Sequence, residues 1–324
     1  MTGFWGEAIG LLEKNGKTTI IAPELEVGRA RDESVDCSVI TAERGTGLIS
    51  SLIGKIKKNQ VCTDCQNYSI MMALKKSVPK IKSSTEPFYN SRMIKDEKEI
   101  KIIKKASKII DEMFELCVKK IKVGQKESEL QTILMKYALE QEMFDTGYKS
   151  TLNPLIIAGG PNGALPHAQV SQRKFKKGDL VVTDLTLRYK GYVSDSTRTF
   201  ALGKISTQAN EAYDVVKESQ KLGLKAVKQN VICKDVDLAC RKYIDEKNFG
   251  KYFIHSTGHG IGLEVHELPN ISIKSNIQLK ENMAITVEPG IYIENKFGIR
   301  IEDSLIVKDR AIIMHKFTKD LLTI

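Results

Sequence analysis

Long apolar stretches, closely spaced cysteines and blocks of like charge are all missing from this sequence of 324 residues. No apolar run approaches the roughly 20 residues that a helix needs to cross a bilayer. Residues 1–12 also lack the basic start and the small-residue cleavage site of a signal peptide. We therefore expect no membrane association and a cytoplasmic protein.

Cysteine is scarce, with six residues in the whole chain. Six cysteines in a chain of this length do not form the framework of a disulfide-stabilised secreted domain. Cys62-Thr-Asp-Cys65 is a single CxxC motif, and a zinc ribbon needs a second pair that the sequence does not contain. We expect free thiols, and the role of Cys62 and Cys65 stays open.

The net charge of +10 is not concentrated in any segment. Residues 1–93 contain 13 basic and 10 acidic residues, and the remainder contains 37 and 30. The most highly charged stretch, 95–129, alternates in sign, which is typical of a solvated helix face. No basic run is interleaved with aromatic residues. This pattern argues against nucleic acid as the main ligand.

The length favours two domains, and the sequence pattern changes near residue 93. Before it, short apolar runs at 18–22 and 35–40 alternate with a helical pattern at 46–57, which indicates a small α/β unit. After it, Asp96 and Glu99 form a capping-box pattern that begins a long amphipathic helix. We expect domains at 1–93 and 94–324.

The second domain is predicted to consist of two related halves. Residues 123–130 are echoed by 231–238 at an offset of 108. Helices are expected at 127–141, 210–228 and 235–245. Antiparallel hairpins are expected at 180–189 with 192–202, around Lys190-Gly191, and at 284–294 with 298–308, around Asn295-Lys296. The fold class is therefore α+β, with helices that cover an antiparallel sheet.

Four acids lie in these apolar strands, where a carboxylate needs a partner. If Lys190-Gly191 is a two-residue turn, Asp184 and Asp195 are diagonal neighbours on one face and need a cation between them. Glu288 and Glu302 repeat the pattern in the second hairpin. The alternative is that these are surface residues or plain ion pairs, for example between one of these glutamates and Arg300.

Histidine usage favours a functional site over ordinary packing. The chain has only five histidines, and four of them, His167, His255, His259 and His266, accompany the acidic strands, whereas His315 lies elsewhere. The glycines between 258 and 262 permit a tight backbone, but the strand and helix of a dinucleotide fingerprint are missing. Two divalent metal ions would balance four carboxylates. Mixed carboxylate and imidazole ligands suit Mn, Co, Zn or Fe.

These residues resemble the pita-bread metallopeptidases, a family that includes methionine aminopeptidases, aminopeptidase P and prolidases. The resemblance covers residues 94–324 and rests on the motifs SDSTRTF, GHGIGLEVHE, TVEPGIY and GIRIED. It implies five metal ligands, which are Asp184, Asp195, His259, Glu288 and Glu302. Residues 1–93 then resemble the creatinase/prolidase N-terminal domain, with its first strand and helix absent.

Finer features are similar to the Xaa-Pro branch of this family. They are His255, the NGALPHA segment around His167, Tyr292 in EPGIY, and Arg300. Thr186 is a departure, because many relatives have glycine there. The resemblance implies an Xaa-Pro dipeptidase. The alternatives are an Xaa-Pro aminopeptidase for longer peptides, then a methionine aminopeptidase, and, from a different class, a non-catalytic binding module.

The resemblance also implies a role for each residue. Glu288 would bind metal and handle the proton, while His167 and His266 would contact the scissile carbonyl. His255, Tyr292 and Arg300 would recognise the proline end of a dipeptide or longer peptide. A structural role is the alternative for His255, and His315 is expected to be structural. The resemblance also implies a homodimer.

Overall fold

The computed structural model describes residues 3–42, 45, 47–56, 60–147 and 155–324. The chain divides into two compact units, Met1–Tyr89 and Asn90–Ile324, whereas the sequence predicted a boundary at residue 93. Among the described residues, no helix is both long enough and apolar enough to cross a membrane. The ends of the helix predicted at 46–57, Thr46 and Lys57, lie outside the described residues, and the helix is observed at Gly47–Ile56.

The first unit contains two small sheets. In one, β1 is antiparallel to β2, and β3 is parallel to β2. In the other, β4 and β5 are parallel and are joined by α3. Its elements are β1 (Ile9–Leu12), β2 (Thr18–Ala22), α1 (Val27–Glu33), β3 (Ser38–Thr41), α2 (Gly47–Ile56), β4 (Val61–Thr63), α3 (Tyr68–Ser77) and β5 (Ile81–Ser83); α4 (Glu86–Met93) leads into the second unit.

Only the second part of the apolar run at 35–40 forms a strand. Asp36 has a φ of 53°, in the left-handed region, so the chain cannot be extended there. Val35 is 60% exposed and is not part of the sheet. The strand β3 therefore begins only at Ser38.

The first half of the second unit contains the predicted long helix and the predicted aspartate hairpin. Asp96 accepts hydrogen bonds from the backbone N–H groups of Lys98 and Glu99, and the Glu99 side chain accepts one from the Asp96 N–H, which completes the capping box. The elements of this half are α5 (Glu97–Lys120), α6 (Glu127–Glu140), β6 (Met143–Phe144), β7 (Leu155–Gly159), η1 (Gly160–Ala164), β8 (Leu180–Tyr189) and β9 (Tyr192–Ala201).

The second half repeats the order of two helices followed by strands. Its two helices begin and end within three residues of the predicted bounds. The elements are α7 (Thr207–Ala226), α8 (Cys233–Glu246), η2 (Gly250–Tyr252), β10 (Gly258–Gly260), β11 (Glu267–Ile271), β12 (Ala284–Val287), β13 (Gly290–Ile293), β14 (Phe297–Arg300), β15 (Asp303–Ile306) and β16 (Ile312–Ile313).

Backbone hydrogen bonds confirm the internal repeat but correct its offset. The N–H of Gly124 donates to the carbonyl of Phe175, and the N–H of Asn230 donates to that of Leu279. Gly124 and Asn230 both have positive φ, 85° and 67°. Asn230 lies 106 residues after Gly124, and Leu279 lies 104 residues after Phe175, so the offset is 106 at the start of the second helix and 104 at its hydrogen-bond partner, rather than the predicted 108. The predicted offset differs because the similarity in sequence matches side-chain types, whereas the structural repeat is defined by the turn before the second helix of each half.

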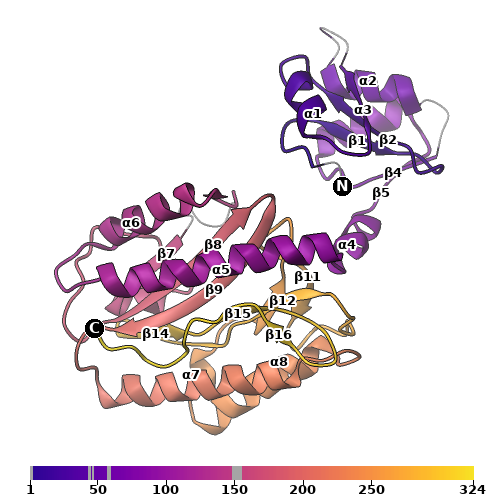
Figure 1. The fold of residues 1–324 in the computed structure, drawn as a ribbon. Helices are drawn as coiled ribbons and strands as arrows, with labels where there is room; N and C mark the ends of the chain where they lie inside the picture. The colour runs from indigo at the N-terminus through magenta and orange to yellow at the C-terminus, as the bar shows by residue number, and fades with distance from the viewer. Residues whose placement is uncertain (1–2, 43–44, 46, 57–59, 148–154) are drawn as a thin grey trace. The chain divides into compact units, whose positions relative to one another are not determined.

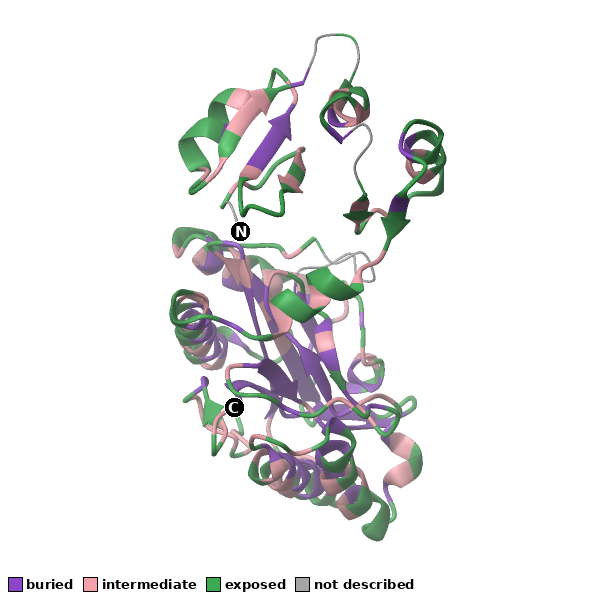
Figure 2. Ribbon diagram, turned by 90° about the vertical axis from the view of Figure 1, so that its right-hand side faces the viewer, coloured by how far each residue is buried: buried purple, intermediate pink, exposed green. Residues whose placement is uncertain are grey.

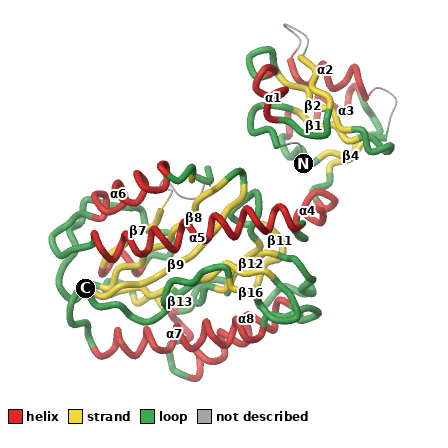
Figure 3. The backbone as a smooth tube through the Cα atoms, viewed as in Figure 1, coloured by secondary structure: helices red, strands yellow, loops and turns green. Residues whose placement is uncertain are grey.

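Strands form the middle of the second unit, between two layers of helices (Figure 1). One apolar core packs α5 and α6 against β7, β8 and β9, and another packs α7 and α8 against the strands of the second half. Figure 3 shows the helices of this unit outside its strands, and Figure 2 shows those strands as predominantly buried. Polar side chains in the central strands therefore face the interior of the protein.

The second predicted hairpin is present but is divided along its length. β12 pairs with β15 in a five-stranded sheet, whereas β13 and β14 pair only with each other. The division falls at Glu288-Pro289 in one arm and at Ile301-Glu302 in the other. The proline lacks an N–H for a continuous ladder. The turn contains three residues, Glu294–Lys296, because Ile293 pairs with Phe297.

Candidate metal centre

The two aspartates lie as the hairpin geometry predicted. Lys190 and Gly191 have φ of 46° and 86°, as in a type I′ turn, and Thr186 pairs with Asp195. The Thr186 hydroxyl oxygen is 2.7 Å from Asp195 Oδ1 and 3.1 Å from Asp184 Oδ1. Since a hydroxyl has one proton, it can donate to only one of these carboxylates, and the pair needs a further positive group.

The two glutamates lie where the second hairpin is divided. Val287 pairs with Asp303 and Gly290 pairs with Arg300, so the two breaks face each other across the hairpin. Glu302 is 1% exposed, and its Oε2 accepts a hydrogen bond of 2.7 Å from the Thr197 hydroxyl. Its Oε1 is buried and has no hydrogen-bond partner within the described part of the chain. A buried carboxylate oxygen without a donor is a position for a cation.

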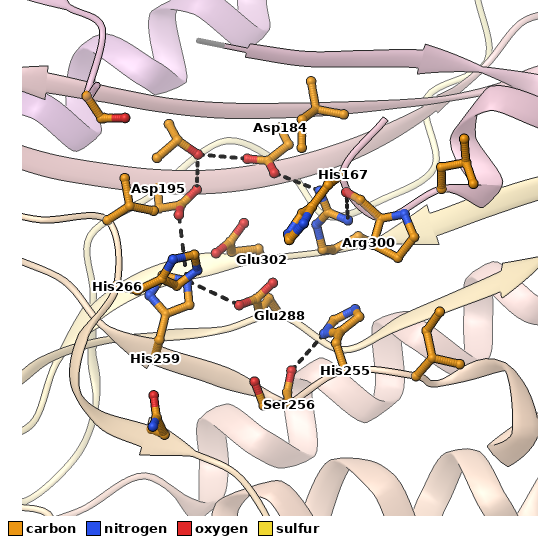
Figure 4. Close-up of a pocket in the computed structure, with 18 residues that line it drawn as sticks. His167, Asp184, Asp195, His255, Ser256, His259, His266, Glu288, Arg300 and Glu302 are labelled. Atoms are coloured by element: carbon orange, nitrogen blue, oxygen red, sulfur yellow. Dashed lines mark hydrogen bonds and ion pairs between the residues drawn. The ribbon is translucent and has the colours of Figure 1, made fainter. Parts of the chain in front are cut away.

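His259 on β10 presents a ring nitrogen to these acids (Figure 4). Its Nδ1 lies 3.1 Å from the carbonyl of Gly260 and donates to it, so Nε2 is the ring nitrogen that faces the acids. Nε2 is 3.3 Å from Glu288 Oε1 and 3.8 Å from Asp195 Oδ2. Ligand atoms of Asp195, His259 and Glu302 all lie within 4.8 Å of one another.

The tight backbone predicted around His259 is confirmed at its two neighbours. A Cβ on Gly258 would collide with the carbonyl oxygen of Thr286, and a Cβ on Gly260 would collide with that of Leu268. Glycine is therefore required on both sides of His259, because β10 lies close to the strands that flank it.

The electrostatics of the site indicate missing positive charge. Burial, followed by the charge of Asp184, raises the pKa of Asp195 well above its usual value. Burial and the neighbouring acids do the same for the pKa of Glu302. Burial also opposes ionisation of Glu288, but its hydrogen bond with His259 and the positive charges of His259 and Arg300 together outweigh burial and lower the pKa of Glu288 to about 2. The donor set fits divalent cations, which would replace the protons that the acids otherwise hold.

Arg300 pairs with an aspartate rather than with either glutamate. It is 3% exposed, and its Nη2 lies 2.7 Å from Asp184 Oδ2. Its Nη1 donates to the Tyr292 hydroxyl at 2.7 Å and to the Pro166 carbonyl at 3.3 Å, and its Nε donates to the Thr197 hydroxyl at 3.0 Å. The alternative of a plain ion pair between Arg300 and one of the glutamates is therefore wrong.

His255 continues the chain of hydrogen bonds from Arg300. Its Nδ1 lies 2.7 Å from the Ser256 carbonyl and donates to it, so Nε2 accepts from the Tyr292 hydroxyl at 2.9 Å. Burial lowers the pKa of His255 and raises the pKa of Tyr292 to about 12. Both residues are therefore neutral near pH 7.

The acids and histidines line one cavity of about 770 Å³. The side chains of His167 and His266 are exposed in it, and the ring centroids of His266 and His259 are 4.1 Å apart. Desolvation and the charge of His259 lower the pKa of His266 to about 4. His315 does not line this cavity; it is buried, and its Nδ1 is 3.3 Å from Asp111, as expected for a structural histidine.

Sequence reasoning missed most of the uncharged cavity wall. The wall includes Thr146, Ile156, Leu165, Ile254 and Asn270. Leu165 and Ile254 are 60% and 64% exposed. Both lie within two residues of a predicted site histidine, and this proximity in the sequence could have indicated that they line the cavity.

Comparisons with known proteins agree with this geometry. Residues 101–309 match the model of metallopeptidase family M24, and residues 1–94 match the creatinase/prolidase N-terminal domain. An Xaa-Pro dipeptidase from Pyrococcus horikoshii is 38% identical over 295 residues, which cover 89% of this chain and 81% of that protein.

Two solved structures show the same fold. An Xaa-Pro dipeptidase from Bacillus anthracis superposes with a TM-score of 0.90 at 33% identity, covering 100% of this chain and 91% of that one. An X-Pro aminopeptidase from Thermotoga maritima gives a TM-score of 0.88 at 31% identity, covering 100% and 92%. The two-unit architecture, the cluster of buried acids around His259 and these matches lead to one conclusion: the chain belongs to metallopeptidase family M24, with the pita-bread fold.

Proposed function

We propose that this metallopeptidase hydrolyses the Xaa-Pro bond of dipeptides. The observation that carries the proposal is that the buried acids around His259 share one cavity with Arg300 and His255, which the Tyr292 hydroxyl links by hydrogen bonds. The Xaa-Pro dipeptidases among its relatives support the same substrate class.

The site would hold two divalent ions. Four carboxylates match the charge of two such ions, and the unpartnered Oε1 of Glu302 is available to one of them. The proposed ligands are Asp184, Asp195, His259, Glu288 and Glu302. Such ions supply Lewis acidity to the scissile carbonyl and make water a stronger nucleophile. Mn, Co, Zn and Fe all suit this mixture of oxygen and nitrogen donors.

Glu288, one of the proposed ligands, and the two nearby histidines would have separate roles in the reaction. The carboxylate of Glu288 takes the proton of the attacking water and returns it to the proline nitrogen as that nitrogen leaves. The imidazoles of His167 and His266 face the same cavity, where an N–H can donate to the carbonyl oxygen as it becomes negative. Such donors are already in place before reaction, so little reorganisation is needed.

The proline end would lie against Arg300, Tyr292 and His255. Four of the five N–H groups of Arg300 donate to protein oxygens, so among the contacts of the described residues one N–H remains for a substrate carboxylate. Both ring nitrogens of His255 are used by Ser256 and Tyr292, so its ring serves as a wall for the proline. The free N–H of Arg300 favours a dipeptide, whose carboxylate is close to the scissile bond.

The proposal is tested with three substrates on metal-loaded protein: an Xaa-Pro dipeptide, an Xaa-Pro-Yaa tripeptide and a peptide that begins with methionine. We expect the highest kcat/KM for the dipeptide. Turnover of the methionine peptide alone would contradict the assignment. Glu302→Gln is the matched control, because it leaves the volume of the side chain almost unchanged but removes the charge.

A second candidate is an Xaa-Pro aminopeptidase that acts on longer peptides. The similarity to the X-Pro aminopeptidase from Thermotoga maritima favours it, and preferred cleavage of the tripeptide would establish it. Uptake of no metal would favour a non-catalytic binding module.

We also propose a homodimer, a cytoplasmic location and a domain division at 1–93 and 94–324. Size-exclusion chromatography with light scattering tests the dimer.

A further inference from the structure

Four described carboxylates outside the metal cluster are buried as deeply as the cluster itself. Asp303 forms ion pairs with Arg198 and Lys319, and the other three lie beside segments that contain the cavity histidines. Glu127 and Asp237 are 0% exposed, and Glu267 is 5% exposed. None of these three acids is among the described residues that line the cavity. A buried carboxylate is retained only where several donors satisfy it, so its donors show what it holds in place.

Glu127, at the start of α6, holds both ends of the segment that contains His167. Its Oε1 accepts from the backbone N–H of Gly159 at 2.9 Å. Its Oε2 accepts from the backbone N–H and the hydroxyl of Ser171, at 3.1 Å and 2.6 Å. The side chain of Asn162 donates to both oxygens at 3.1 Å. One side chain thus fixes residues 159, 162 and 171 around the segment that presents His167.

Asp237, in the second turn of α8, does the same for the segment that contains His255. Its Oδ1 accepts from the backbone N–H and the hydroxyl of Thr257, at 3.0 Å and 2.9 Å. It also pairs with Arg241, which donates to the carbonyls of Phe253 and His255 at 3.0 Å and 2.8 Å. The guanidinium group lies over the Phe253 ring, 4.2 Å from its centroid. The pair therefore holds residues 253, 255 and 257.

Glu267 closes the turn that contains His266. Its Oε1 accepts from the backbone N–H groups of Leu263 and Glu264, at 2.8 Å and 3.1 Å. A Cβ on Gly262 would meet this carboxylate, so the turn wraps around it closely. The last residue of the turn thus fixes its first residues, with His266 between them.

Two cations neutralise Glu267 from the segment before α5. Lys95 is 2% exposed, and its Nζ lies 3.1 Å from Glu267 Oε2. Arg92 donates from Nε to Oε1 at 3.1 Å and forms a second bond from Nη2 to the same oxygen. The turn of His266 is therefore tied by charge to the junction of α4 and α5.

We propose that Glu127, Asp237 and Glu267 are positioning residues, each of which fixes the backbone segment that presents one cavity histidine. Their charge-assisted hydrogen bonds hold loops that apolar packing alone leaves free to move. The inference rests on the proposed function only for the roles of His167, His255 and His266. The positioning itself is a property of the fold and is tested without substrate.

The test replaces each acid by its amide, in Glu127→Gln, Asp237→Asn and Glu267→Gln. The amide turns an acceptor oxygen into an NH₂ group that faces N–H donors, so the anchor is lost with little change in volume. Imidazole resonances in ¹H–¹⁵N spectra of the full chain, recorded with and without Zn²⁺, are a clean readout because the chain has only five histidines.

Each variant is expected to shift the resonances of its own histidine. Asp237→Asn shifts His255 and Glu127→Gln shifts His167. Glu267→Gln shifts His266 together with His259, since the two rings are in contact. His315 is the internal reference in all three. Equal shifts at all five histidines, or no shift at the paired one, would overturn the proposal.

Exposed acids on the same helices are matched controls. Glu129→Gln on α6 and Asp235→Asn on α8 are expected to leave the cavity histidines unchanged. If Asp237→Asn does not fold, Arg241→Lys keeps the charge but loses the contacts with Phe253 and His255, and it is expected to shift His255 alone. Ser171→Ala and Arg92→Lys are the corresponding milder variants for Glu127 and Glu267. Unchanged imidazole spectra in Arg241→Lys, Ser171→Ala and Arg92→Lys would also contradict the proposal.

Kinetics with an Xaa-Pro dipeptide separate the three roles. We expect Asp237→Asn to raise KM about 10-fold, since His255 contacts the substrate, and the other two variants to lower kcat about 10-fold. If the wild-type protein hydrolyses no Xaa-Pro dipeptide, the proposed function fails while the imidazole spectra still decide the positioning. If all three variants change kcat and KM in the same way, the proposal that each acid positions a different histidine is contradicted.

Discussion

Asp184 and Arg300 are 116 residues apart in the sequence, yet their side chains form a 2.7 Å ion pair at the edge of the acid cluster. Sequence patterns placed both residues on strand faces, because side chains alternate along a strand. They did not identify the partners, since pairing between hairpins depends on how the two halves pack. The Tyr292 hydroxyl, between Arg300 and His255, was unpredictable for the same reason.

Replacing Arg300 by lysine tests this network at the scale of one residue. Lysine keeps the charge but cannot contact Asp184, Tyr292 and Thr197 at once, because its ammonium is a single point. We expect kcat/KM on an Xaa-Pro dipeptide to fall roughly 10- to 100-fold and metal affinity to weaken by a similar factor. Titration calorimetry and steady-state kinetics measure the two effects. A variant with wild-type values would show that the network is dispensable.

Element boundaries show where local sequence signals were sufficient. The long helix α5 was predicted because its capping box lies entirely between Asp96 and Glu99. The helix α7 begins three residues before its predicted start, because Ser206 caps it by accepting a hydrogen bond from the Ala209 N–H. The division of the second hairpin at Glu288 and Glu302 depends on pairing with other strands, so the pattern of residues 284–308 alone could not show it.

Removal of the cap of α5 tests the contribution of one helix end. Asp96→Ala removes the side chain that accepts hydrogen bonds from the backbone N–H groups of Lys98 and Glu99, so half of the capping box is lost. We expect the free energy of unfolding to fall by about 1 kcal/mol, measured by urea denaturation. Lys104→Ala, at an exposed position in the same helix, is the control and should change stability little. An equal loss in both variants would argue against the cap.

The turn at residues 262–267 gives a prediction about pH. Burial raises the pKa of Glu267, but Lys95 and Arg92 outweigh it and hold that pKa below the ordinary 4.5. A carboxylate with a depressed folded-state pKa stabilises the protein fully above the unfolded value, and this stabilisation is lost as pH falls through the folded value. The difference in Tm between wild type and Glu267→Gln should therefore be constant near neutral pH and shrink below about pH 4.5. A difference that does not change with pH would contradict the ion pair.

At the scale of the whole molecule, the net charge of the chain is positive, whereas the cavity of the second unit contains a cluster of acids. The net charge of +10 belongs to a surface of mixed sign, whereas four acids converge in the cavity of the second unit. Composition could not predict this, because a net charge is dominated by exposed residues. The spacing of acids in apolar strands did predict it, because isolated buried carboxylates are too costly to retain without a partner.

Metal binding should therefore stabilise the folded chain. The proposed ligands come from both halves of the second unit, and unfolding separates them. At a free metal concentration of 100 times Kd, we expect a stabilisation of about 2.7 kcal/mol, seen as a rise in Tm. Glu302→Gln should lose most of this rise. A Tm that does not respond to Mn²⁺, Co²⁺ or Zn²⁺ would count against the metal centre.

The most direct test of the account is hydrolysis of an Xaa-Pro dipeptide by protein of known metal content. We predict turnover that requires bound divalent metal, stops on chelation, returns when metal is restored, and is abolished in Glu302→Gln. Turnover that survives chelation, or a fully metal-loaded protein that does not cleave the dipeptide, would contradict the account.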